Sequence, residues 1–323
     1  MHVLIIKTSS MGDILHTLPA LTDAMQMLPE ICFDWVVEEN FAQIPAWHPA
    51  VRQVIPVAIR RWRKNWFCSV TRQERYKFKR KLQQERYHAT IDAQGLIKSA
   101  ALITRISHGV KHGLDYKSAR EPLACWFYHR QHTVSKQQHA IERIRQLFAA
   151  SLDYQLPVTP GDYAIANQFS PPPDAKGYLV FLHATTRSNK HWPEAHWRAL
   201  IKLADHAGYR IKLPWGEQHE YLRAHRLAEG FNLAEVMAPL MLSEIATQLS
   251  GVAAVVSVDT GLSHLAAALH CPNITLYGPT EPNLIGSYGY HQKALRAKDK
   301  KMESLTAAYV WQTLQPMLPP KKS

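Results

Sequence analysis

The strongest constraint on the fold is the stretch 252–280, in which a buried strand turns into a helix within a few residues. Residues 252–258 form an almost unbroken apolar run, which suits a strand buried on both faces of a parallel sheet. After Asp259, Thr260 and Gly261, apolar residues recur at helical spacing. In an open α/β sheet such a turn lies at the carboxyl edge, where a helix N-terminus binds anions. The turn alone allows either a phosphate site or a helix simply capped by Asp259 and Thr260.

The order of strand, polar loop and helix recurs along the chain, which predicts parallel, doubly wound α/β sheets. The expected elements of the first half are strands 3–6, 33–37, 54–57 and 89–92 and helices 13–28, 96–105 and one around 141–148. Those of the second half are strands 178–183, 210–213 and 274–277 and helices 193–208, 217–229, one from 243 and 303–317. The last helix could pack on either half.

A proline-rich stretch without periodicity, around 155–175, separates the two halves. A chain of 323 residues is long enough for two cores. We therefore expect an N-terminal domain over 1–160 and a C-terminal domain over 161–323.

The formal charge of +12 calls for an anionic partner: nucleic acid, an acidic membrane surface or a charged substrate. The four cysteines are far apart and match no metal or redox motif. No apolar run approaches the length of a signal peptide or a membrane span. We expect a cytoplasmic protein that does not cross a bilayer.

Much of the charge lies in Arg60–Lys81, where ten basic residues face a single acid, Glu74, and aromatic residues are interleaved. Such a segment is often only a solvated basic helix. Basic and aromatic residues together also suit the headgroup level of an acidic membrane, or single-stranded nucleic acid. The segment alone does not decide among these three.

Three polar loops follow buried strands, at 8–13, 184–193 and 259–264. Lys190 and Arg187 could hold a diphosphate beside the helix that begins at Gly261, with Thr185 and Thr186 as hydroxyl donors. Glu220 could accept hydrogen bonds from a ribose, or be a solvated helix carboxylate. No glycine-rich dinucleotide motif, P-loop or metal-ligand spacing follows a strand. His191 and His264 are isolated and are more often structural.

Four ordered segments carry a resemblance to a known family: VLIIKTSSMGDILHTLPAL, HATTRSNKHWPEAHW, IKLPWGEQHE and VVSVDTGLSHLAAALHCPNITLYGPT. Together they resemble the bacterial lipopolysaccharide heptosyltransferases. The TTR, KHWP and RRWRKNW patterns are similar to the type I enzymes of that family.

The resemblance implies a GT-B glycosyltransferase with two Rossmann-like domains facing across a cleft. It implies inverting transfer of heptose from ADP-L-glycero-β-D-manno-heptose, without metal or cofactor, to the inner Kdo of Kdo2-lipid A. The enzyme would act as a peripheral protein on the cytoplasmic face of the inner membrane, in lipopolysaccharide core biosynthesis.

The resemblance also implies roles for individual residues. Asp13 is the expected general base. The expected donor-binding residues are Thr185, Thr186, Lys190, Glu220, Leu240, Asp259, Thr260, Gly261 and His264, with Leu240 contacting the adenine through its backbone. The expected acceptor-binding residues are Arg60, Arg61, Arg63, Lys64 and Arg120. They suit a glycolipid that carries phosphates and carboxylates.

Three alternatives stay open. A type II heptosyltransferase would share the fold and the Asp13 motif but use an already heptosylated acceptor. A nucleotide-sugar 2-epimerase would release a free sugar and need no acceptor. A non-enzymatic RNA binder would use the basic aromatic segment and give steeply salt-dependent affinity.

Overall fold

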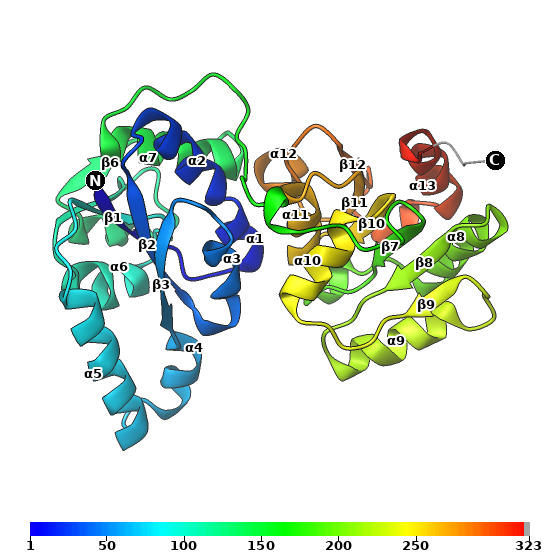
Figure 1. Ribbon diagram of the computed structural model, residues 1–323, viewed down its shortest axis with the longest axis horizontal. Coiled ribbons are helices and arrows are strands. Elements are labelled where there is room, and N and C mark those ends of the chain that lie inside the picture. Colours follow the sequence, from blue (N-terminus) through cyan, green and yellow to red (C-terminus); the bar gives the residue numbers. More distant parts are fainter. Residues whose placement is uncertain (320–323) are drawn as a thin grey trace. The chain divides into compact units, whose positions relative to one another are not determined.

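The chain divides into two compact units in a computed structural model, which describes residues 1–319. The first unit comprises Met1–Ala164, coloured blue to green in Figure 1, and the second begins at Ile165. Each unit has its own sheet of six parallel strands.

The first sheet has the strand order β3-β2-β1-β4-β5-β6. Its strands are β1 (His2–Ile6), β2 (Cys32–Glu38), β3 (Val51–Val57), β4 (Ala89–Asp92), β5 (Val110–Leu114) and β6 (Arg130–His132). Its helices are α1 (Met11–Leu15), α2 (Leu18–Met27), α3 (Gln43–Ala46), α4 (Ile59–Trp62), α5 (Ser69–Gln83), α6 (Ile97–Leu102) and α7 (Ala140–Leu152). Its 3-10 helices are η1 (Glu39–Phe41), η2 (Arg63–Asn65), η3 (Thr104–Ile106) and η4 (Pro122–Phe127). This strand order is that of a dinucleotide-binding Rossmann sheet.

The second sheet repeats that order, as β12-β11-β10-β7-β8-β9. Its strands are β7 (Tyr178–Leu182), β8 (Arg210–Leu213), β9 (Ala234–Val236), β10 (Ala254–Val258), β11 (Asn273–Tyr277) and β12 (Gln292–Arg296). Its helices are α8 (Glu194–His206), α9 (Gln218–Ala228), α10 (Leu242–Ser250), α11 (Gly261–Ala268), α12 (Pro282–Ile285) and α13 (Ala307–Leu314). Its 3-10 helices are η5 (Ala166–Gln168), η6 (Ser188–Lys190), η7 (Met302–Ser304) and η8 (Gln315–Met317). The expected α/β class with two Rossmann-like sheets is confirmed.

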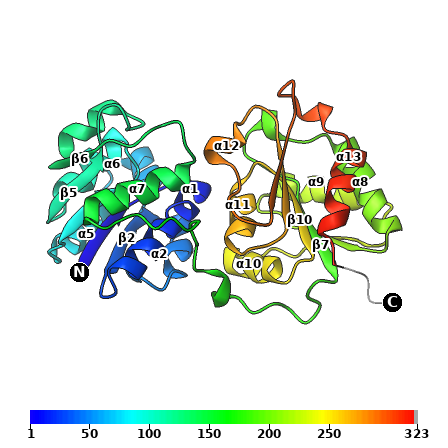
Figure 2. The same ribbon diagram turned by 90° about the horizontal axis from the view of Figure 1, so that it is seen from above.

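Several expected elements have different bounds. The helix expected over 13–28 is two helices, α1 and α2, separated at His16 and Thr17. Pro19 lies in the first turn of α2, where its missing N–H costs nothing, so a new helix starts there. The helix expected over 96–105 ends at Leu102 and continues as η3. The last helix is shorter than expected and packs against α8 in the second unit (Figure 2).

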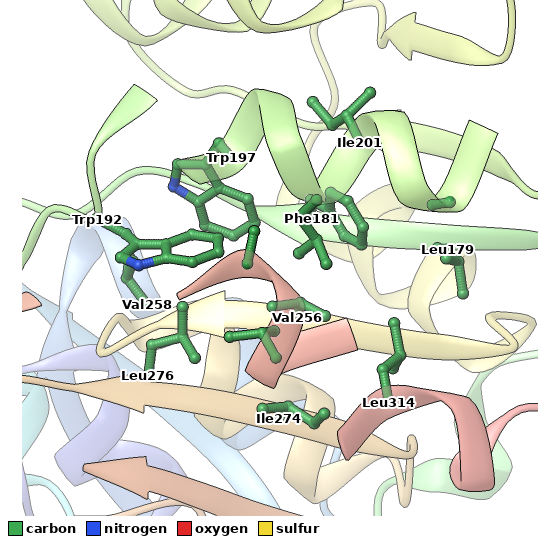
Figure 3. Packing of buried hydrophobic residues seen from close by; sticks show 14 of the residues in the cluster. Leu179, Phe181, Trp192, Trp197, Ile201, Val256, Val258, Ile274, Leu276 and Leu314 are labelled. Atoms are coloured by element: carbon green, nitrogen blue, oxygen red, sulfur yellow. The ribbon is translucent and has the colours of Figure 1, made fainter. Parts of the chain in front are cut away.

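The core of the second unit forms around the apolar strands that the sequence predicts. Figure 3 shows side chains of β7, β10 and β11 meeting those of α8 and α13. Trp192 and Trp197 pack edge to face, with ring centroids 4.9 Å apart. The Trp192 indole N–H donates to the Leu305 carbonyl oxygen at 2.8 Å. This bond ties the start of α8 to the segment before α13, so α13 belongs to this core.

A buried ion pair fixes the helices α2 and α7 to each other in the first unit. The Arg145 guanidinium on α7 donates to both carboxylate oxygens of Asp23 on α2, at 2.7 and 3.2 Å. Arg145 also donates to the carbonyl oxygens of Pro157 and Thr159, so it holds the segment that follows α7. Both charged groups are almost fully buried.

Replacing Asp23 with alanine is expected to lower the free energy of unfolding of the first unit by about 3–5 kcal/mol, because Arg145 is left buried without its carboxylate. Denaturant unfolding followed by circular dichroism measures this loss. The control is Glu142→Ala, which removes a more exposed partner of Arg145 and should cost about 1 kcal/mol or less. Equal losses from the two variants would contradict the prediction.

Among the described helices, none combines the length and the hydropathy that a membrane span requires.

Candidate functional site

The turn between β10 and α11 brings together three segments of the second unit. The Asp259 carboxylate, only 7% exposed, accepts hydrogen bonds from Lys190 Nζ at 2.5 Å and Thr280 Oγ1 at 2.6 Å. Thr185 Oγ1 donates to the Asp259 carbonyl oxygen at 3.0 Å. The loop after β7, the turn after β10 and the residues after β11 therefore meet at one carboxylate.

The start of α11 lacks the side-chain cap that the sequence allowed. Thr260 is the N-cap residue, and its side chain makes no capping hydrogen bond. The Asp259 carboxylate is instead held by Lys190 and Thr280. A helix N-terminus without a side-chain cap, with an ammonium group beside it, has the properties of an anion-binding site.

The remaining donor candidates of the second unit differ in exposure. On the loop after β7, Thr185 is buried while Thr186 and Arg187 are exposed. Leu240, in the loop before α10, is half-buried. His264 lies inside α11 and is buried.

Glu220 has a structural role in the first turn of α9. Its Oε2 atom accepts hydrogen bonds from the backbone N–H groups of Gly216, at 2.7 Å, and Glu217, at 3.2 Å. It thus closes a capping box, as Glu at the third helical position commonly does. Both bonds use the same oxygen, and no hydrogen bond described within residues 1–319 uses Oε1.

In the first unit, Asp13 lies on α1, directly after the polar loop that follows β1. Its Oδ2 atom accepts hydrogen bonds from Ser10 N at 2.9 Å and Ser10 Oγ at 2.8 Å. Asp13 is therefore held in a fixed orientation at the start of the helix. It lies near the carboxyl end of β1, the central strand, as the sequence predicts.

Sequence reasoning missed the groups that support this loop. The buried Lys7 ammonium donates to the Ala93 carbonyl oxygen at 2.9 Å. Gln94 Oε1 accepts hydrogen bonds from the backbone N–H groups of Thr8, at 2.9 Å, and Ser9, at 3.2 Å. Burial lowers the pKa of Lys7, while the nearby Asp13 and Asp92 carboxylates favour its charged form. The signal that could have identified Lys7 is its position directly after an apolar strand.

Asp92, at the end of β4, organises the loop that contacts Lys7 and Thr8. Its fully buried carboxylate accepts hydrogen bonds from Gln94 N, Ser99 Oγ and Thr104 Oγ1, among others. Burial raises the pKa of Asp92, and these hydrogen bonds oppose that effect. The loops after β1 and β4 therefore form one hydrogen-bonded support for Asp13.

The basic acceptor candidates lie on α4 and η2, which follow β3. Arg61 donates to both Glu39 and Glu74, and these ion pairs raise its pKa. The Arg60 guanidinium lies 5.8 Å from the centre of the Phe41 ring. Arg63 and Lys64 are exposed. Arg120 is exposed in the loop after β5, close enough to Lys7 to lower its pKa.

Both tryptophans of the segment are engaged by other side chains of the first unit. Trp62 is 6% exposed and its indole N–H donates to Glu74 Oε2 at 2.6 Å. The Arg75 guanidinium covers Trp66, with its carbon 3.6 Å from the ring centre. The tryptophans therefore offer little stacking surface for bases, whereas Phe67 and Tyr76 of the same segment are exposed.

Within residues 1–319, no three His, Cys, Asp or Glu side chains gather in a group that could hold a metal ion.

Comparison with known proteins gives consistent matches. The family described as "Glycosyltransferase family 9 (heptosyltransferase)" matches residues 75–312. Lipopolysaccharide heptosyltransferase 1 of Escherichia coli strain K12 is 62% identical over 316 residues, which cover 97% of this chain and 99% of that protein.

Two solved structures are similar over nearly the whole chain. The E. coli heptosyltransferase WaaC with ADP has a TM-score of 0.96 and 61% identity, covering 98% of this chain and 100% of that one. WaaC with ADP-2-deoxy-2-fluoro heptose has a TM-score of 0.93 and 61% identity, covering 98% and 99%. The two doubly wound sheets, the family match and the similar relatives all agree. The chain therefore belongs to glycosyltransferase family 9, the heptosyltransferases.

Proposed function

We propose that this protein is a type I lipopolysaccharide heptosyltransferase. It transfers L-glycero-D-manno-heptose from ADP-heptose to the inner Kdo of Kdo2-lipid A, with inversion at the anomeric carbon. The observation that carries the donor half is the meeting of Lys190, Thr280 and Asp259 beside the start of α11. Two similar structures, each 61% identical to this chain, are E. coli WaaC with ADP and WaaC with ADP-2-deoxy-2-fluoro heptose. They support ADP-heptose as the donor.

The donor diphosphate would bind at the N-terminus of α11. The backbone N–H groups there and the Lys190 ammonium would stabilise the negative charge that develops on the leaving phosphate oxygen. Asp259, which also accepts a hydrogen bond from Thr280, holds Lys190 in place. Thr185 and Thr186 lie on the same loop as Lys190, after β7. Glu220 would contact the ribose, and the Leu240 backbone would contact the adenine. His264 completes the donor set.

Asp13 would act as general base. It takes the proton from the acceptor hydroxyl while that oxygen attacks the anomeric carbon, and the bond from that carbon to the phosphate oxygen breaks. The electron pair leaves with ADP. The two hydrogen bonds from Ser10 to Oδ2 orient the carboxylate for this role.

The acceptor would be held by the basic residues of the first unit. Arg60, Arg63 and Lys64 would meet the phosphates and carboxylates of Kdo2-lipid A, with Arg61 oriented by its two glutamates and Arg120 beside Lys7. The ten basic residues of Arg60–Lys81 support peripheral binding to the anionic cytoplasmic face of the inner membrane.

The test is transfer from ADP-heptose to purified, deacylated Kdo2-lipid A, measured as ADP release and as heptosylated product. We expect turnover that a chelator does not change. Turnover only with the already heptosylated acceptor would identify a type II enzyme instead. Free epimerised sugar in place of a heptosylated product would contradict the transferase proposal altogether.

A further inference from the structure

The first unit contains a cavity that the donor and acceptor residues above do not use. It has a volume of about 370 Å³ and lies between α4 and α5 on one side and α6 and η3 on the other. Its walls are mainly apolar and include Trp62, Phe78, Ile103 and Ile106. Volumes of about 300–1,000 Å³ are typical of small-ligand sites.

The helix α5, which lines the cavity, contributes few residues to the core. Of the fifteen residues of α5, only Thr71 and Leu82 are buried. Its other positions are mostly charged or polar, and Phe78 lines the cavity and packs against Trp62. In Figure 1, α4 and α5 form the lower tip of the first unit.

The mouth of the cavity combines positive charge with exposed apolar surface. Arg72 and Lys79 are exposed and line it together with Tyr76 and Leu102, which are 66% and 41% exposed. Nearby on the same segment, Phe67 is 91% exposed. An apolar interior with a cationic mouth complements an anionic headgroup attached to a hydrocarbon chain.

We infer that this cavity binds an acyl chain of the acceptor glycolipid, with one phosphate of that lipid at Arg72 and Lys79 and its other anionic groups at the acceptor residues named above. The inference rests on the proposed function. The cavity is lined by Val57, the last residue of β3, and by Ile59, the first residue of α4. β3 is two strands away from β1, after which Asp13 lies, or about 10 Å across the sheet. A lipid held there would keep its sugar end near the base.

The inference is tested first by direct binding of dodecyl phosphate, an anionic amphiphile, below its micellar concentration. Ala101→Trp fills the cavity, because Ala101 is a half-buried lining residue on α6. The matched control is Ala150→Trp, an exposed position on α7. We expect binding at least about tenfold weaker in A101W and unchanged in A150W, since each buried methylene contributes about fourfold. Equal binding by both variants would overturn the inference.

A second variant tests the inference even if A101W does not fold. Lys79→Glu changes an exposed residue at the mouth, so it should fold normally and weaken dodecyl phosphate but not dodecanol. Inorganic phosphate should not compete with dodecyl phosphate, because the chain supplies the affinity. Displacement by inorganic phosphate at comparable concentration would mean that the cavity plays no part.

The values of kcat/KM for acylated and deacylated Kdo2-lipid A show whether the hydrocarbon chain in the cavity belongs to the acceptor. A101W should lower the value for the acylated acceptor at least about tenfold and leave the deacylated one within about twofold. If A101W loses dodecyl phosphate binding but keeps the same ratio of kcat/KM between the acylated and deacylated acceptors, the cavity binds a bilayer lipid. That result would overturn the acceptor assignment. If neither acceptor reacts with the unmodified protein, the proposed function fails, while the dodecyl phosphate result still stands by itself.

Discussion

Replacing Asp13 with asparagine should remove nearly all heptosyl transfer, lowering kcat by about 10²–10⁴-fold, and leave the affinity for ADP-heptose unchanged. General base catalysis typically contributes a factor of this size. Asparagine retains an oxygen that can accept the two hydrogen bonds from Ser10, so α1 should keep its start. The variant therefore removes the base and preserves the local structure.

The measurement is single-turnover transfer together with equilibrium binding of ADP-heptose. The matched control is Asp153→Asn, which makes the same chemical change at an exposed position of the same unit. Asp153 has a positive φ of 57°, a conformation that asparagine tolerates well. Turnover within about threefold of the unmodified protein in the Asp13 variant would show that another group accepts the proton.

The central strands and the turns after them are predictable because burial leaves a clear pattern in the sequence. β1, β7, β10 and β11 are apolar runs with nearly every residue buried, and each is followed by a polar turn. Of these strands, β1, β7 and β10 are followed by the segments that hold Asp13, Lys190 and Asp259. The placement of these residues was therefore predicted together with the centre of each sheet, while their roles stay predictions.

Three of the four edge strands, β6, β9 and β12, were not predicted, because their residues carry little burial signal. β6 and β9 have three residues each and none of those residues is buried, and β12 has one buried residue, Leu295. Such strands form because a neighbouring strand offers backbone hydrogen bonds, which side-chain pattern does not record.

The sequence also did not show which side chains contact one another. The basic run at Arg60–Lys81 gives a count of charges, but Arg61 is paired with Glu39 and Glu74, and Arg75 covers Trp66. Thr280 was missed as a site residue because its contact with Asp259 requires β10 and β11 to be neighbours in the sheet. The first polar residues after a buried strand are the signal that would find such a group.

Replacing Lys190 with methionine should lower kcat by about 10²–10³-fold and weaken ADP binding. Methionine keeps the length of the side chain and removes the ammonium group, so the negative charge on the leaving diphosphate loses a fixed donor. The change also leaves the Asp259 carboxylate, now held by Thr280 alone, beside the diphosphate. Repulsion between the two anions adds to the loss of binding.

Steady-state kinetics and calorimetric titration with ADP measure the two effects separately. The matched control is Lys202→Met, an exposed lysine on α8 of the same unit, which should change neither. The double variant Lys190→Met with Asp259→Asn should bind ADP better than Lys190→Met alone, because the unpaired carboxylate is gone. If the double variant binds no better and the single variant keeps its ADP affinity, Lys190 serves only to hold the turn at Asp259, and the diphosphate must bind elsewhere in the second unit.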